Sequence, residues 1–171
     1  MIDPPNIVTL EALVKTIQSN PEKARARYVP ARATIESGFK CQVKGPSGEH
    51  IETDMPTAMG GAGLGPNPGW YFRASLAACC STVVAMQAAR CGIKLTKVEV
   101  TVGGNGDQRG LLGLDDNISA AHTDIRTEVQ IGAENATPEQ LKELVQWALE
   151  HSPVCRTVRD ASNNTVNIVV V

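Results

Sequence analysis

The stretch SLAACCSTVVAMQAARCG, residues 75–92, is apolar or small on every side of the helix that it predicts. A helix without a polar face is buried all round. A sheet covers only one face of such a helix, and a chain this short has few other helices to cover the rest. We therefore expect a homodimer in which this helix lies against its counterpart.

Two adjacent cysteines, Cys79 and Cys80, lie in the middle of this helix. Successive helical residues point about 100° apart, so the two thiols face different surroundings and cannot form a disulfide with each other. The face of Cys79 also carries Ser75 and Thr82, which makes it the more polar one. Either Cys79 lines a site, or it is a small core residue, the usual role of a free cysteine. A structural role is assigned to Cys41, Cys80 and Cys91.

The composition is that of one folded domain. Of 171 residues, 42% are hydrophobic and 20% charged, and a net charge of −2 without a basic patch argues against nucleic acid. The N-terminus has no basic leader before an apolar segment, and no window approaches the ~20 apolar residues of a membrane span. Five cysteines without C-x-x-C spacing predict a reducing compartment. We expect a cytoplasmic protein with no membrane partner.

The pattern of apolar residues predicts an α+β fold with a largely antiparallel sheet. The first helix begins after Thr9, its expected N-cap, and stops at Asn20-Pro21. A turn at 45–48 joins two strands, and a glycine- and proline-rich loop at 55–69 is long enough to suggest a function. Further helices are expected at 68–90, 137–151 and from 153, and strands at 31–44, 50–54, 94–106, 124–132 and 164–171. Residues 1–29 are assigned to a helical extension and residues 30–171 to a single domain.

The segment HSPVCRTV, residues 151–158, places the fifth cysteine, Cys155, at the start of a helix. Ser152 is a good N-cap and Pro153 a good first residue, so Cys155 is the third helical residue. The unpaired amides and the positive end of the helix dipole favour the thiolate there, and Arg156 adds positive potential. On local physics Cys155 is the best thiolate candidate; alternatively it is a small residue packed under the helix. His151 is a candidate base or a partner of the preceding helix's C-terminal dipole.

Three segments, in order, resemble the OsmC/Ohr family of stress-related hydroperoxide reductases. They are DMPTAMGGAGLGPNPGWYFRASLAACC at residues 54–80, GIKLTKVEVTVGG at 92–104 and TPEQLKELVQWALEHSPVCRTV at 137–158. The resemblance implies sheets wrapped around two central buried helices in an intertwined homodimer. It also implies that a helix cysteine attacks an organic hydroperoxide, a second cysteine resolves the sulfenic acid as a disulfide, and an external dithiol restores both. The attacking position falls on Cys79, and no cofactor is implied.

The chain departs from the family pattern at two places. The second cysteine of the family is replaced by Ser152, and a thiol follows three residues later at Cys155, which is near enough across one helical turn to substitute for it. The family's glutamate after the helix-starting proline has no counterpart in PGWY, residues 68–71, and its arginine has none nearer than Arg32. Candidate sources of positive charge are Arg73 and Arg156. The aromatic residue Trp70 suggests an altered pocket mouth, or else an anchor for the helix start.

Three functions remain open at this point. The leading one is reduction of alkyl or lipid hydroperoxides by Cys79, with Cys155 as the resolving thiol. The second is a non-catalytic homodimer that binds a small hydrophobic ligand, and the third is a protein whose thiol is oxidised once as a redox sensor. A metal site is not expected, because His50, His122 and His151 lack ligand spacing.

Overall fold

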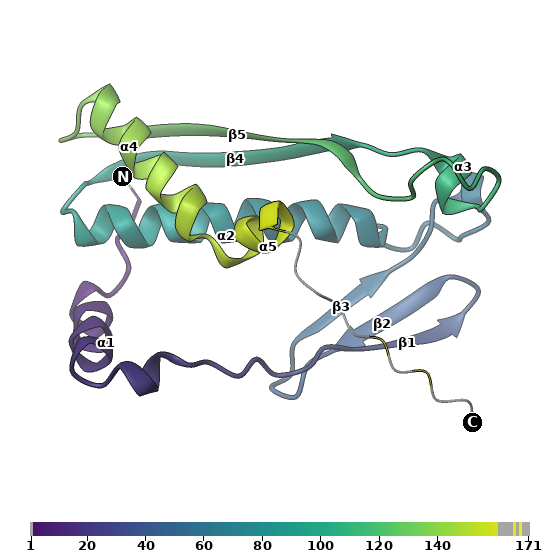
Figure 1. The fold of residues 1–171 in the computed structure, drawn as a ribbon, viewed down its shortest axis with the longest axis horizontal. Coiled ribbons are helices and arrows are strands. Elements are labelled where there is room, and N and C mark those ends of the chain that lie inside the picture. The colour runs from purple at the N-terminus through teal and green to yellow at the C-terminus, as the bar shows by residue number, and fades with distance from the viewer. Residues whose placement is uncertain (1, 161–165, 167, 169–171) are drawn as a thin grey trace. The chain divides into compact units, whose positions relative to one another are not determined.

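The structure is a computed structural model that describes residues 2–160, 166 and 168. The chain divides into two compact units, one of Asn6–Ala74 and one of Met1–Pro5 with Ser75–Val171 (Figure 1). The helices are α1 (Ile7–Ser19), α2 (Pro68–Arg90), α3 (Gln108–Leu111), α4 (Pro138–His151) and α5 (Pro153–Asp160), with short 3-10 helices at Pro21–Ala24 and Thr57–Met59. The strands are β1 (Arg32–Ser37), β2 (Lys40–Lys44), β3 (His50–Thr53), β4 (Leu95–Asn105) and β5 (Thr123–Ala133).

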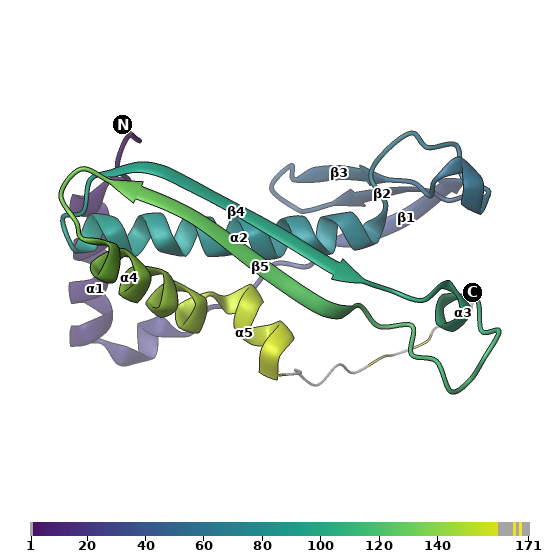
Figure 2. The same ribbon diagram turned by 90° about the horizontal axis from the view of Figure 1, so that it is seen from above.

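The unit that begins at Ser75 contains the apolar core. Its strands β4 and β5 form a long antiparallel hairpin that runs along α2, and α4 lies against the same assembly (Figures 1 and 2). Each element contributes its apolar face, as the helical and alternating patterns predict. The fully covered core residues are Cys80, Val83, Val84, Ala88, Leu95, Leu141, Leu144 and Ala148.

Helix α4 is held at both ends by side chains that its sequence supplies. Thr137 and Gln140 form a capping box in which each side chain bonds the other's backbone N–H, and Pro138 occupies the first turn. At the other end the His151 ring lies 2.7 Å from the Trp147 carbonyl oxygen. His151 therefore takes the dipole-partner role of the two that the sequence left open. The chain turns at Ser152 and starts α5 at once.

The unit of Asn6–Ala74 is a three-stranded antiparallel sheet, β1-β2-β3, with α1 before it and a glycine-rich loop after it. Every residue of β1 is exposed, and α1 buries none of its residues. The buried residues in this unit, among those described, are the polar pair Thr53 and Asp54. The apolar residues of this unit are therefore at most half-buried in the single chain.

Most of the predicted elements are confirmed. Helix α2 has the predicted bounds and is followed by Gly92 in the left-handed region, at a φ of 67°. The expected N-cap of α1 was wrong: Asn6 caps the helix by accepting the Thr9 N–H. The region 31–44 is two strands joined at Gly38, not one. The strand predicted at 164–171 lies outside the described residues except at 166 and 168, and the boundary at residue 29 stays a prediction.

Helix α2 has an exposed stripe in the single chain. Leu76, Cys80 and Val84 are buried, but the residues at helical spacing on another face are exposed, namely Ser75, Ala78, Thr82 and Met86. By length and composition alone, α2 passes a test for a helix that could span a membrane. The test is weak here, because core helices of soluble proteins also pass it.

Candidate functional site

The Cys79 sulfur lies against the start of another helix. The Ser152 hydroxyl donates a hydrogen bond to Cys79 Sγ at 3.1 Å, and Ser152 itself is 0% exposed. Cys79 is half-buried at the edge of the core, so its sulfur is neither sealed in nor fully exposed. The two residues are far apart in sequence, and the packing of α4 and α5 on α2 brings them together (Figure 1).

Ser152 is the N-cap of α5, as the sequence predicts. Its hydroxyl oxygen accepts the Cys155 backbone N–H at 3.4 Å, and its carbonyl accepts the Arg156 N–H. Cys155 is half-buried in the first turn of α5 and packs against the core. Ser152 thus contacts both cysteines that the sequence selects: Cys79 through its sulfur and Cys155 through its amide.

Cys80 differs from its neighbour in every respect that matters for reactivity. It is 0% exposed, and burial raises the pKa of its thiol to about 11, helped by charge interactions with Cys155 and then Cys79. At neutral pH Cys80 stays a protonated thiol and is a poor nucleophile.

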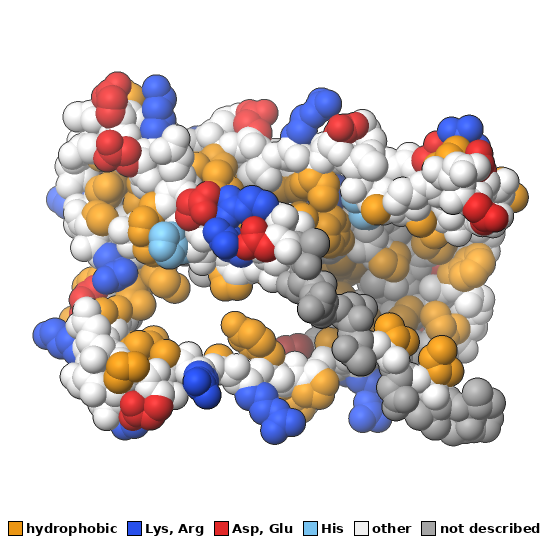
Figure 3. Space-filling model, viewed as in Figure 1, with side chains coloured by type: hydrophobic (Ala, Val, Ile, Leu, Met, Phe, Trp, Pro, Cys, Tyr) orange, Lys and Arg blue, Asp and Glu red, His pale blue; other side chains and the backbone are white. Residues whose placement is uncertain are grey.

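The arginines of α5 are engaged by carboxylates. Arg156 pairs with Glu150 at 3.2 Å and with Asp160 at 2.6 Å, and Arg159 pairs with the same two residues. Figure 3 shows these acidic and basic side chains intermixed on the surface over α4 and α5. In the described part of the chain, no arginine bonds the Cys79 sulfur, which accepts its hydrogen bond from Ser152. The role proposed from sequence for Arg156 stays a prediction.

The two other predicted site residues lie at the start of α2, in the unit that ends at Ala74. Trp70 is 49% exposed and meets Tyr71 edge to face, with ring centroids 5.2 Å apart. The Tyr71 hydroxyl donates to the Glu52 carbonyl, which fastens this turn to β3. Arg73 is half-buried. These contacts fit the helix-anchoring interpretation of the aromatic pair.

Sequence reasoning missed Asp54, which organises the glycine-rich loop. Its carboxylate is 2% exposed and accepts three backbone N–H groups, from Met55, Ala62 and Leu64, at 2.8–3.1 Å. These bonds, first of all the one from Leu64, hold the pKa of Asp54 below its ordinary value. A Cβ on Gly61 would collide with the Met55 carbonyl, so the loop requires glycine there. The signal was an acidic residue directly before a glycine-rich run.

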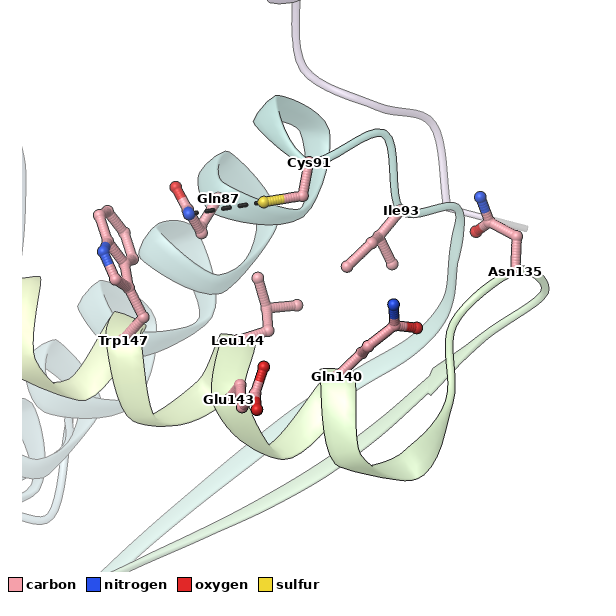
Figure 4. A pocket seen from close by; sticks show the side chains of 8 residues that line it. All are labelled: Gln87, Cys91, Ile93, Asn135, Gln140, Glu143, Leu144 and Trp147. Carbon is pink, nitrogen blue, oxygen red and sulfur yellow. Dashed lines mark hydrogen bonds between the residues drawn. The ribbon is translucent and has the colours of Figure 1, made fainter.

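A cavity of about 360 Å³ opens at the C-terminal end of α2, where Cys91, Gln87, Leu144 and Trp147 line it together with Ile93, Asn135, Gln140 and Glu143 (Figure 4). Gln87 donates to the Cys91 sulfur at 3.5 Å, and Cys91 is exposed rather than a covered structural residue. Asn135 bonds Lys94 and Gly92, so its amide serves the turn before β4. The cavity contains neither Cys79 nor Cys155.

All five cysteines are free thiols. Within residues 2–160, 166 and 168, no group of three His, Cys, Asp or Glu side chains is placed to hold a metal ion. The chemistry that the site offers is therefore that of a half-buried thiol beside a hydroxyl and the start of a helix.

A comparison with protein families identifies the class. The model of the OsmC-like protein family matches residues 60–167, which include α2, the β4–β5 hairpin, α4 and α5. The chain belongs to the OsmC-like protein family. Curated proteins give no match to the sequence.

Solved structures agree with this assignment at the level of the fold. An OsmC-like protein from Mycoplasma pneumoniae superposes with a TM-score of 0.67 at 15% identity, over 79% of this chain and 89% of that one. An organic hydroperoxide resistance protein from Elizabethkingia anophelis gives 0.59 at 23% identity, over 79% and 90%. An organic hydroperoxide resistance protein OsmC from Legionella pneumophila gives 0.56 at 22% identity, over 79% and 92%. The predicted α+β, OsmC-like fold is confirmed.

Proposed function

We propose that this protein reduces organic hydroperoxides with a thiol, and that Cys79 is the attacking residue. The observation that carries the proposal is the contact of Cys79 Sγ with Ser152 Oγ at 3.1 Å, because residue 152 occupies the place of the family's second cysteine. Residue 152, which corresponds to the family's resolving cysteine, thus lies beside Cys79. Two of the solved structures with this fold are organic hydroperoxide resistance proteins, which supports the same reaction class.

In the proposed reaction the Cys79 thiolate attacks one peroxide oxygen. The O–O bond breaks, the sulfur becomes a sulfenic acid and the alkoxide takes a proton to leave as an alcohol. The Cys155 thiol then condenses with the sulfenic acid, which forms a disulfide and releases water. An external dithiol reduces this disulfide by exchange and returns both thiols.

The proposal includes a homodimer in the cytoplasm. Helix α2 carries an exposed stripe beside Cys79, and β1 and α1 have no covered side, so a second copy would bury surfaces that the single chain leaves in water. An apolar alkyl or lipid hydroperoxide suits a site between such surfaces. Arg73 and Arg156 are proposed sources of positive charge near the thiolate, the latter after exchanging a carboxylate partner.

The test is consumption of cumene hydroperoxide with dithiothreitol as reductant, together with a count of free thiols after one equivalent of peroxide. We expect turnover by the wild-type protein and a loss of two thiols per chain. Cys155→Ser should lose one thiol and form no intramolecular disulfide. Equal thiol loss in both proteins would remove Cys155 from the mechanism.

A non-catalytic dimer that binds a small hydrophobic ligand is the second candidate. It is favoured by Ser152, which cannot form a disulfide, and by the carboxylates that hold Arg156. Absence of turnover above that of Cys79→Ser would support it. A sulfenic acid or mixed disulfide that forms once, without turnover, would instead identify a redox sensor, and mass spectrometry distinguishes these outcomes.

A further inference from the structure

The Ser152 hydroxyl stands between a helix start and the Cys79 sulfur. It is fully buried, accepts the backbone N–H of Cys155 at 3.4 Å and donates its own proton to Cys79 Sγ at 3.1 Å. A buried hydroxyl that accepts from one group and donates to another loses its freedom to rotate. The direction of its O–H bond is therefore set by the fold, toward the sulfur.

This arrangement extends the positive potential at the N-terminus of α5 to the Cys79 thiol. The first amides of α5 bear partial positive charge, and a hydroxyl that accepts a hydrogen bond from one of them becomes a stronger donor. Hydrogen bonds to a charged acceptor are stronger than those between neutral groups, and more so where water is excluded. Ser152 therefore favours negative charge on Cys79.

The nearby cations are less able to do this. Arg156 and Arg159 each pair with Glu150 and Asp160, so four charges of α4 and α5 cancel largely among themselves. On this side of the site, the positive potential at Cys79 therefore comes from the first amides of α5, through the Ser152 hydroxyl.

We propose that Ser152 is a positioning residue for Cys79, which holds the sulfur beside the start of α5 and stabilises its thiolate. The importance of Ser152 for catalysis rests on the proposed function, but its effect on the Cys79 thiolate does not. Because oxygen forms no disulfide with Cys79, Ser152 also leaves the oxidised sulfur available to another thiol.

The test measures alkylation of Cys79 by iodoacetamide in the full-length protein, followed by peptide mass spectrometry across a range of pH. We expect Ser152→Gly to slow alkylation at pH 7 roughly tenfold, as loss of one hydrogen bond to a charged group predicts. The pH midpoint of the rate should rise. Glycine is a tolerated N-cap, so α5 is retained. Ser152→Thr, which keeps the hydroxyl, should restore the rate and the profile.

The matched control is Ser81→Ala, which removes a hydroxyl of α2 that donates to the Ala77 carbonyl. It should leave the alkylation rate of Cys79 within about twofold, because this hydroxyl bonds the backbone of its own helix and not the Cys79 sulfur. An unchanged rate and pH profile in Ser152→Gly, or an equal loss in Ser81→Ala, would overturn the proposal.

A second variant tests the geometry without relying on Ser152→Gly folding. Diamide oxidation, which removes one hydrogen from each of two thiols, should join residues 79 and 152 in Ser152→Cys. Failure to form this disulfide would overturn the placement of residue 152. The alkylation assay contains no peroxide, so its result does not depend on the proposed function. If Ser152→Gly slows alkylation of Cys79 but the wild-type protein shows no peroxide turnover, only the proposed function is refuted.

Discussion

Cys79 lies within α2 and Cys91 directly follows it, and each sulfur accepts a hydrogen bond, but their surroundings differ. Cys79 receives a fully buried hydroxyl from the start of α5, at 3.1 Å. Cys91 receives the amide of Gln87, one turn earlier in its own helix, at 3.5 Å, and lies exposed in a cavity (Figure 4). The first contact joins residues 73 positions apart, whereas the second joins residues 4 apart.

The difference indicates what should make one thiol of this protein more reactive than another. Gln87 is a local partner, one helical turn from Cys91, and helical spacing alone brings such a pair together. The partner of Cys79 is fixed by the packing of three helices, which orients its proton and excludes water. We therefore expect reactivity at Cys79 and little beyond ordinary thiol behaviour at Cys91.

The largest expected effect separates the two cysteines directly. Cys79→Ser should lower kcat/KM for cumene hydroperoxide by a thousandfold or more, on the order seen when a covalent nucleophile is removed. Cys91→Ser should retain the wild-type value within about twofold. Steady-state kinetics with dithiothreitol measure both, and a large loss in Cys91→Ser would break the comparison.

The region around Cys91 should matter for stability instead. Leu144 is 5% exposed, belongs to the core and lines the cavity. Leu144→Ala should lower the free energy of unfolding by about 2–5 kcal/mol, measured in urea, because it opens a void in packed surroundings. Lys142→Ala, on the exposed side of the same helix, serves as control and should change it by less than about 0.5 kcal/mol. Leu144→Ala variants that remain folded should alkylate Cys79 at the wild-type rate.

Cys80 adds a third case to the comparison, because its buried thiol is expected to be unreactive. Its pKa is raised from 9.0 to about 11, so the unfolded chain ionises first as pH rises. The stabilising effect of the neutral thiol is complete below pH 9 and is lost toward pH 11, by at most about 1.4 kcal/mol per pH unit. Urea unfolding at pH 8–11 should show this extra loss in the wild type and not in Cys80→Ala. Parallel curves for the two proteins would contradict it.

The smallest effect concerns α4, which carries Trp147 near Cys91 and is followed by Ser152 near Cys79. Thr137→Ala removes the capping box of α4 and should cost about 1 kcal/mol of unfolding free energy. Thr137→Ser keeps an accepting hydroxyl and should cost only a fraction of this. Thermal unfolding checks both, and an equal loss would mean that the methyl group, not the cap, carries the effect.

Local signals were sufficient to predict α1, α2, α4 and α5, whereas the four-residue helix α3 was not predicted. Proline at 68 and 138, the cap at Thr137 and Gly92 after α2 mark ends that depend on neighbouring residues alone, and the structure confirms them. The N-cap of α1 was misplaced because Asn6 and Thr9 are both good capping residues at the spacing of one turn. A choice between two such residues depends on backbone angles that a sequence does not state.

The site was predictable only in part. Helix-start chemistry selected Ser152 and Cys155, and the resemblance selected Cys79, but the bond from Ser152 to Cys79 depends on how α5 packs on α2. The ion pairs of Arg156 likewise depend on Glu150 and Asp160 sharing its face. Asp54 escaped notice because its partners are backbone amides, which any residue supplies.

The loop closed by Asp54 has a consequence for how the protein tolerates acid. Because the carboxylate, not the acid, accepts the three amides, its contribution to stability is complete above the ordinary aspartate range near 3.8 and disappears as pH falls through the lower pKa of the folded protein. Mild acidification would therefore leave the glycine-rich segment in place. Stronger acid would release residues 55, 62 and 64 together, since one proton removes the acceptor that they share.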